Sequence, residues 1–223
     1  MCFSAEADFV SGAVIGAIGV ATLTKVKYPR EIPLAALPLA FAVHQVIEGF
    51  VWRDIDDGIT RVHGAAVNLY VAFAWVVLPI LVPLAVMLVE PRKFHRRAIG
   101  VLVVLGAVAG GYLALAVFGG GVTAHAVEHT LQYGGAGRWG WEATYLYVVA
   151  TCGAPLLSSF RAIVWFGVAN LFAVAAIAFV QAEGLTSVWC LWAAVVSVLI
   201  FVQFSWWHRG DAPLPLPRVE QAT

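Results

Sequence analysis

The sequence predicts an all-α membrane protein: one bundle of seven transmembrane helices, with the N-terminus outside the cell and the C-terminus inside. Of its 223 residues, 61% are hydrophobic and only 12% are charged, whereas soluble domains carry about 25% charged residues. Seven apolar segments approach or exceed the roughly 20 residues that cross a bilayer as a helix. Lysine and arginine gather in alternate connections between these segments, which is typical of cytoplasmic loops.

The apolar segments follow one another with short connections and use nearly the whole chain. The first and fifth are the shortest. No stretch remains for a soluble domain, so residues 1–208 are predicted to form one transmembrane domain. The Pro-rich residues 209–223 are predicted to form a disordered cytoplasmic tail. The seven segments are Phe9–Thr24, Ile32–Trp52, Ala65–Val89, Ala98–Phe118, Trp141–Leu157, Ala162–Ala182 and Leu185–Trp207.

The distribution of basic residues predicts the orientation. With the N-terminus outside, the inner side holds ten lysines and arginines and the outer side holds three. Acidic Glu6 and Asp8 precede the first segment and no basic residue does, which does not fit a cleaved signal peptide. The inner residues are Lys25, Lys27, Arg30, Arg92, Lys93, Arg96, Arg97, Arg161, Arg209 and Arg218; the outer ones are Arg53, Arg61 and Arg138.

Two ionisable residues lie inside the second segment. His44 and Glu48 are separated by four positions and therefore share one helical face. At 1.5 Å per residue they lie roughly 13 and 7 Å below Arg53, in the outer half of the bilayer. Ionisable groups at that depth are costly unless they are paired or hydrated, and they often mark a site. The pair is a candidate metal-binding site; the alternative is a structural hydrogen bond between helices.

The segment "HAVEH", residues 125–129, is predicted to lie on the same outer side. Its pattern matches the inverted zincin motif, in which two histidines bind zinc and the glutamate acts as general base. If the segment is helical, His125, Glu128 and His129 share a face. Together with His44 and Glu48 they could form one site for a divalent transition metal, best suited to zinc. The alternative is a hydrated interfacial loop.

Cys2 is a further candidate. If Met1 is removed, Cys2 offers an amine and a thiol on the outer side, where it could act as a nucleophile or bind a metal. The zero net charge argues against a nucleic-acid partner. The lipid bilayer is the partner that the composition implies.

The opening "MCFSA" and the later "HQVIE" resemble the N-terminal MCFSA and the H-Q-x-x-E of an uncharacterised family of bacterial integral membrane proteins. The resemblance implies a protein of the bacterial plasma membrane and implies no activity. The layout is more distantly similar to seven-span zinc amidohydrolases such as alkaline ceramidases, but their motif order is not reproduced here.

Two classes of function therefore remain open. The first is a zinc-dependent hydrolase acting on a lipid-like molecule, in which His44, His125 and His129 hold the metal with Glu48, and Glu128 activates water. The second is a non-catalytic metal- or haem-binding protein, a sensor or a subunit of a membrane complex. A site with an open coordination position favours the first class, and a saturated site favours the second.

Overall fold

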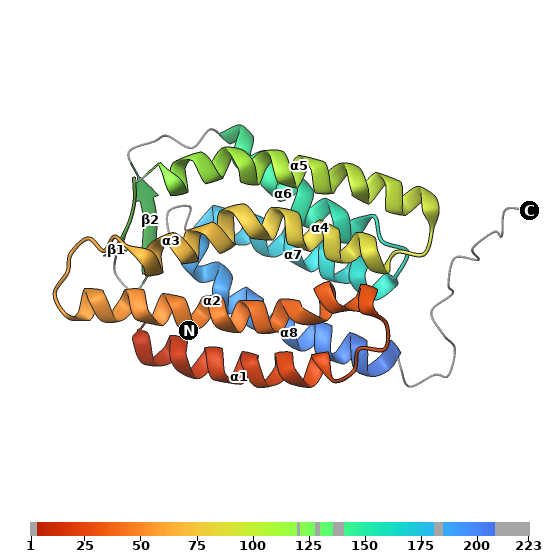
Figure 1. The fold of residues 1–223 in the computed structure, drawn as a ribbon, viewed down its shortest axis with the longest axis horizontal. Helices are drawn as coiled ribbons and strands as arrows, with labels where there is room; N and C mark the ends of the chain where they lie inside the picture. The colour runs from red at the N-terminus through yellow and green to blue at the C-terminus, as the bar shows by residue number, and fades with distance from the viewer. Residues whose placement is uncertain (1–3, 120, 128–129, 136–140, 181–184, 208–223) are drawn as a thin grey trace, which may run out of the picture.

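A computed structural model describes residues 4–119, 121–127, 130–135, 141–180 and 185–207 of the chain. These residues form long helices that run side by side and one β-hairpin that lies at one end of them (Figure 1). The elements are α1 (Ala5–Leu23), η1 (Pro29–Glu31), α2 (Ile32–Asp56), α3 (Ala65–Val71), η2 (Ala72–Val77), α4 (Leu78–Val89), α5 (Lys93–Phe118), β1 (Val122–Val127), β2 (Thr130–Gly135), α6 (Trp141–Leu156), α7 (Arg161–Val180) and α8 (Leu185–Trp207).

The mostly helical fold is confirmed, and the predicted apolar segments coincide with helices. The largest differences are at three helix ends: α1 begins four residues before Phe9, α2 ends four residues after Trp52, and α5 begins five residues before Ala98. Ser4 explains the first difference, because its hydroxyl accepts a hydrogen bond from the Ala7 amide at 3.3 Å and so caps the helix. Within the described residues, four stretches are long and apolar enough to cross a membrane: Ala5–Leu23, Pro29–Asp56, Ala65–Val89 and Lys93–Phe118.

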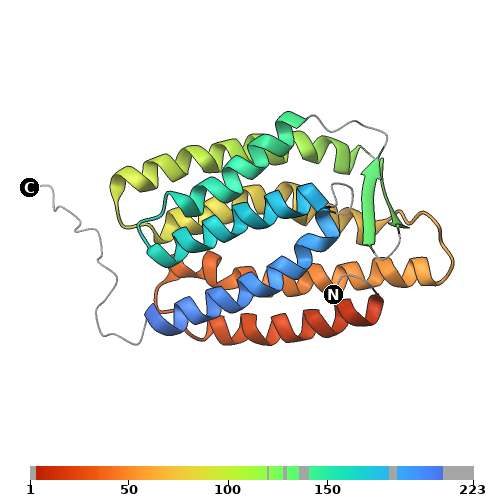
Figure 2. The same ribbon diagram turned by 180° about the vertical axis from the view of Figure 1, so that it is seen from behind.

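Successive helices alternate in direction when α3, η2 and α4 are taken as one continuous helix, so the bundle has two distinct ends. The hairpin end carries the first turns of α1, α3 and α6 together with the two strands (Figures 1 and 2). The opposite end carries the connections that follow α1, α4 and α6. Helix α8 returns along the bundle and packs against both α1 and α2.

Helices α3 and α4 form one rod with a π-helical turn, η2, between them. The Leu78 amide donates its hydrogen bond to the Phe73 carbonyl, five residues back. Pro79, one residue further, has no amide hydrogen to donate. Helix α5 approaches this rod closely at two glycines: a Cβ on Gly106 would lie 1.8 Å from the Pro79 carbonyl oxygen, and one on Gly110 would lie 2.7 Å from that of Val76. This G-x-x-x-G spacing is typical of close helix contacts in membranes.

Helices α1 and α2 also meet at glycines. A Cβ on Gly19 would lie 2.6 Å from the Leu39 amide nitrogen, and one on Gly12 would lie 2.8 Å from the Val46 side chain. The close contact buries the face of α1 that carries Asp8, which has no exposed surface. The second segment's polar residues therefore meet a polar residue of the first.

The hairpin is the part of the fold that the sequence did not predict. Val122–Val127 and Thr130–Gly135 pair as antiparallel strands in which His125 lies opposite Gln132 and Ala124 opposite Tyr133. A backbone bridge joins Val62, in the α2–α3 connection, to Ala124 through two hydrogen bonds of 2.8 Å. The helical arrangement considered for HAVEH is therefore wrong for its first three residues. The β-branched residues Val122, Thr123 and Val127 favour a strand here, and Gly119 ends α5.

Candidate functional site

The H-Q-x-x-E sequence of α2 presents its polar side chains in two directions. His44 and Glu48 lie about 40° apart around the helix, whereas Gln45 lies about 100° from His44. All three are buried, with exposed fractions of 6% for His44, 2% for Gln45 and 0% for Glu48. One motif therefore serves two separate polar contacts in the bundle.

Three aromatic rings stack at the first of these contacts. The His44 ring lies against Tyr70 of α3, with ring centroids 3.9 Å apart and planes 12° apart. Tyr70 stacks in turn on Tyr133 of β2, at 4.4 Å and 18°. Phe73 of η2 also contacts the His44 ring, at 4.9 Å. The stack links α2, the α3 rod and the hairpin, so it holds the hairpin over the end of the bundle.

Tyr133 also reaches the carboxylate of Glu48. Its hydroxyl donates a hydrogen bond to Glu48 Oε1 at 3.4 Å. Tyr133 thus contacts Glu48 directly, and the Tyr70 ring lies between Tyr133 and His44. We call His44, Glu48, Tyr70 and Tyr133 the α2–hairpin site.

His44 brings a buried ring nitrogen to this site. Its Nδ1 atom is buried and has no hydrogen-bond partner among the described residues. Leaving a buried polar atom without a partner costs about 1–3 kcal/mol. A hydrophobic ring of similar shape would avoid that cost.

The second polar contact joins α1 and α2. The Gln45 amide donates a hydrogen bond to Asp8 Oδ1, and the Ser11 hydroxyl donates to the Asp8 backbone carbonyl at 3.1 Å. Asp8 follows the MCFSA opening and Gln45 belongs to H-Q-x-x-E. The helix that begins at the last residue of MCFSA therefore meets the H-Q-x-x-E segment of α2.

Only part of the predicted site is brought together in the described part of the chain. His44 and Glu48 share the α2–hairpin site, as their spacing predicted. His125 lies on the other face of the hairpin from Tyr133, because neighbouring strand residues alternate in direction and Tyr133 pairs with Ala124. Its Nδ1 is buried and has no hydrogen-bond partner among the described residues.

The remaining predicted site residues, Cys2, Glu128 and His129, lie outside the described residues, as does the predicted tail at 209–223. Within the residues that are described, no group of three or more His, Cys, Asp or Glu side chains could hold a metal ion. The complete metal site therefore stays a prediction: His44 and Glu48 lie together, and His125 is described but lies on the other face of the hairpin.

Glu90, at the opposite end of the bundle, is a buried carboxylate that accepts several hydrogen bonds. Glu90 follows α4, and its carboxylate accepts hydrogen bonds from the Arg92 amide at 3.1 Å and the Ser159 amide at 2.7 Å. The hydroxyls of Ser158 and Ser159 donate to it as well, and His95 Nδ1 lies 3.2 Å from the Ser159 hydroxyl. Glu90 therefore ties together the connections that follow α4 and α6, which is a structural role.

Sequence reasoning missed four residues at the hairpin end: Asp8, Gln45, Tyr70 and Tyr133. Gln45 and Asp8 carried a usable signal, since a carboxylate and an amide in apolar helices need partners. Tyr133 carried none, because a tyrosine between glycine-rich stretches near a membrane surface is typical of an interfacial loop.

Comparison with known proteins identifies the family of the chain. A family model described as "Family of unknown function (DUF6629)" matches residues 1–214. The chain belongs to this family. No curated protein and no solved structure matches the chain. Membership of DUF6629 agrees with the resemblance seen in the sequence, and it leaves the function to be inferred from the site.

Proposed function

We propose that this DUF6629 chain is a seven-span protein of the bacterial plasma membrane with an outward-facing metal site built on His44 and Glu48. The metal is a divalent transition metal, best matched by zinc. The activity that we propose is hydrolysis of a lipid-like molecule that enters from the outer leaflet. The N-terminus lies outside the cell and the C-terminus inside.

The charge distribution in the fold supports this orientation. Among the described residues, eight lysines and arginines lie at the opposite end and two, Arg53 and Arg61, lie near the hairpin end. Cytoplasmic loops carry the excess of basic residues. The α2–hairpin site is then on the outer side. The eight are Lys25, Lys27, Arg30, Arg92, Lys93, Arg96, Arg97 and Arg161.

The observation that carries the metal proposal is the buried Nδ1 of His44, which has no hydrogen-bond partner among the described residues. A neutral imidazole nitrogen is a strong zinc ligand, and Glu48 on the same helical face supplies a carboxylate, the second common ligand type. Binding a divalent ion offsets the cost of burying both groups, so the metal also stabilises the fold.

The remaining ligands come from HAVEH and the N-terminus in this proposal. His129 completes the set with His44 and Glu48, Glu128 acts as general base toward a metal-activated water, and Cys2 contributes a thiolate or a nucleophile. His125 can bind the same metal only if the hairpin rotates about its long axis, because the His125 and Tyr133 side chains project from opposite faces of the hairpin. When bound, zinc would polarise a carbonyl group of the substrate.

A second candidate function, non-catalytic metal binding, is favoured by the sealing of the site. His44 and Glu48 are at most 6% exposed, and the stacked rings of Tyr70 and Tyr133 cover them. A catalytic metal needs an open position for water or substrate. The hydrolase therefore requires that the hairpin open, whereas a structural or sensory metal site does not.

Elemental analysis of the purified protein tests the metal proposal. We expect about one zinc or similar ion per chain, and a loss of most of it in His44→Ala and Glu48→Ala. His95→Ala is the matched control, because His95 lies at the opposite end; it should keep its metal. A wild-type protein without bound metal after expression in zinc-supplemented medium would rule out the proposal.

The same preparations separate the two functions. Glu128→Gln should keep the metal and lose hydrolysis of ester- and amide-linked lipids if Glu128 is the base. If wild-type protein holds the metal but hydrolyses none of these lipids, the non-catalytic function is the correct one. If His44→Ala does not fold, His44→Gln keeps a polar side chain of similar length and replaces it in the test.

A further inference from the structure

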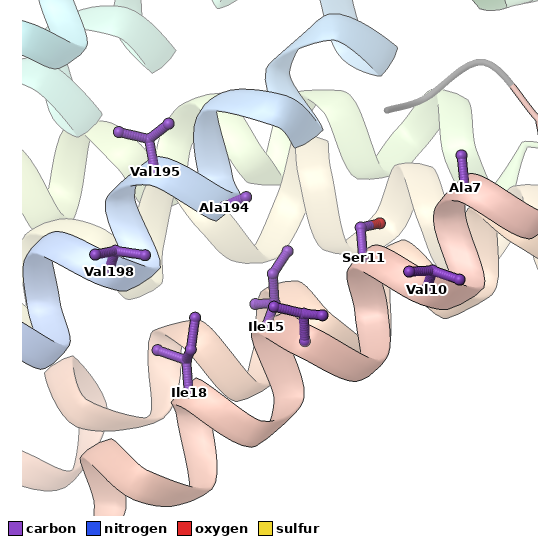
Figure 3. A pocket seen from close by; sticks show the side chains of 9 residues that line it. Ala7, Val10, Ser11, Ile15, Ile18, Ala194, Val195 and Val198 are labelled. Carbon is purple, nitrogen blue, oxygen red and sulfur yellow. The ribbon is translucent and has the colours of Figure 1, made fainter.

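A groove runs along the outside of the bundle between α1 and α8 (Figure 3). Its volume is about 450 Å³, within the roughly 300–1,000 Å³ of small-molecule sites. All of its walls are aliphatic except for one serine, and that serine's hydroxyl is already bonded to the Asp8 carbonyl. The α1 wall extends from Ala7 to Ile18, and Ala194, Val195 and Val198 form the α8 wall.

We propose that this groove binds one acyl chain of a phospholipid from the outer leaflet. The inference rests on the membrane placement proposed above and is independent of the metal. Its first support is position: four of the lining valines are 43–65% exposed on helices that are mostly apolar, so in a membrane the groove opens toward lipid. Those valines are Val10, Val14, Val195 and Val198.

The length of the groove fits one leaflet. Its α1 wall extends from Ala7 to Ile18, which is about 16 Å at 1.5 Å per residue. Half of the roughly 30 Å hydrocarbon core of a bilayer is about 15 Å. The groove begins in the first turn of α1, at the hairpin end, and therefore spans the outer leaflet in the proposed orientation.

The width of the groove fits a hydrocarbon chain and excludes a helix. A volume of about 450 Å³ over a length of about 16 Å gives a mean cross-section of about 28 Å². An α-helix with side chains is about 10–12 Å across, which corresponds to about 80–110 Å². A partner helix, from this chain or another, could lie on the groove but not in it.

The lining also favours a phospholipid over a free fatty acid. None of the described residues that line the groove is charged, so the wall offers no partner for a free carboxylate. A phospholipid needs none, because its head group stays at the membrane surface. The acyl chain alone then occupies the groove, held by apolar contact.

Photolabelling tests this binding site. Full-length protein in nanodiscs would be labelled with a phosphatidylethanolamine that carries a diazirine in its acyl chain, and labelled peptides would be mapped by mass spectrometry. We expect peptides of both α1 (residues 7–18) and α8 (residues 194–198) to be labelled at least several-fold more than the exposed face of α5. Uniform labelling of all exposed helices would overturn the proposal.

A filled groove provides the control. Val14→Trp places a large side chain in the groove and should reduce labelling of α8 at least several-fold. Val104→Trp on α5 is matched to it, since the two valines are 57% and 61% exposed, and should leave labelling unchanged. Ala194→Phe fills the groove from the other wall and replaces Val14→Trp if that variant does not fold.

The other occupants give different results. If free oleate but not unlabelled phospholipid competes with the label, the groove binds a free fatty acid. If crosslinks form between two chains through α1 and α8, the groove binds a second copy of the chain. Either result overturns the proposal. The metal content of the same samples reports separately on the metal site. Absence of metal with intact groove labelling would reject the proposed function alone.

Discussion

Substitution of His44 by phenylalanine distinguishes a metal ligand from a buried structural ring. Phenylalanine keeps an aromatic ring against Tyr70 and Phe73, at positions where the His44 ring now lies 3.9 and 4.9 Å from theirs. It removes both ring nitrogens, including the buried Nδ1 that has no hydrogen-bond partner among the described residues. The two interpretations of His44 then predict opposite changes in stability.

The magnitudes follow from the burial of that nitrogen. If no metal binds, removing the unsatisfied atom should stabilise the protein by up to about 1–3 kcal/mol, less any cost of fitting a larger ring. If a metal binds, wild-type protein at a free zinc concentration 100 times Kd gains about 2.7 kcal/mol, and His44→Phe gains almost none. For a chain of this size each kcal/mol corresponds to about 2–4 °C in Tm, so the zinc-dependent difference is about 5–10 °C.

Thermal unfolding in detergent, followed by tryptophan fluorescence, measures this difference. We expect chelation with EDTA to lower the Tm of the wild-type protein by about 5–10 °C and to leave His44→Phe unchanged. His95→Phe is the control for a histidine at the opposite end and should respond to EDTA as the wild type does. The reasoning is refuted if EDTA leaves the wild-type Tm unchanged while His44→Phe has a higher Tm than the wild type.

Three other predictions concern the hairpin, the packing and the orientation. Tyr133→Phe removes the hydrogen bond to the Glu48 carboxylate but keeps the ring stack. The free energy of unfolding should therefore fall by about 0.5–1.5 kcal/mol. An unchanged Tm would mean that the bond contributes nothing. Gly106→Val should prevent or severely impair folding, judged by size-exclusion chromatography, while Gly111→Val, where a Cβ meets no atom within 4 Å, should elute as the parent does. In intact cells that carry the protein with Cys2→Ser, a membrane-impermeant maleimide should label Gly58→Cys and not Lys93→Cys, and the reverse pattern would invert the proposed orientation.

Local sequence was sufficient for the helices because the driving force is local. Apolar segments in lipid must bond their own backbone groups, and a helix does this within one segment. One boundary shifted because a polar side chain acts on the backbone: the Ser4 hydroxyl caps the start of α1. The close pair His44 and Glu48 was predictable for the same reason, since four residues span about one turn.

Rotation of each helix about its axis was not predictable from hydrophobicity, because helices that are apolar all round give no preferred inward face. Glycines decide it here: Gly12 and Gly19 bring α1 against α2, and this close contact buries Asp8 beside Gln45. The contact joins residues 37 positions apart in the chain.

The sequence by itself determined which segments are helical and that a histidine and a carboxylate share one face of α2, since both depend on neighbours within one helical turn. Only the tertiary structure decided what covers that face. HAVEH was predicted to approach it, but a β-hairpin forms, whose register turns Tyr133 toward Glu48 and His125 to the opposite face. Strand alternation has a period of two, so a single step in pairing decides which side chain meets the site. That register depends on contacts such as the Val62–Ala124 bridge, between residues that lie far apart in the chain.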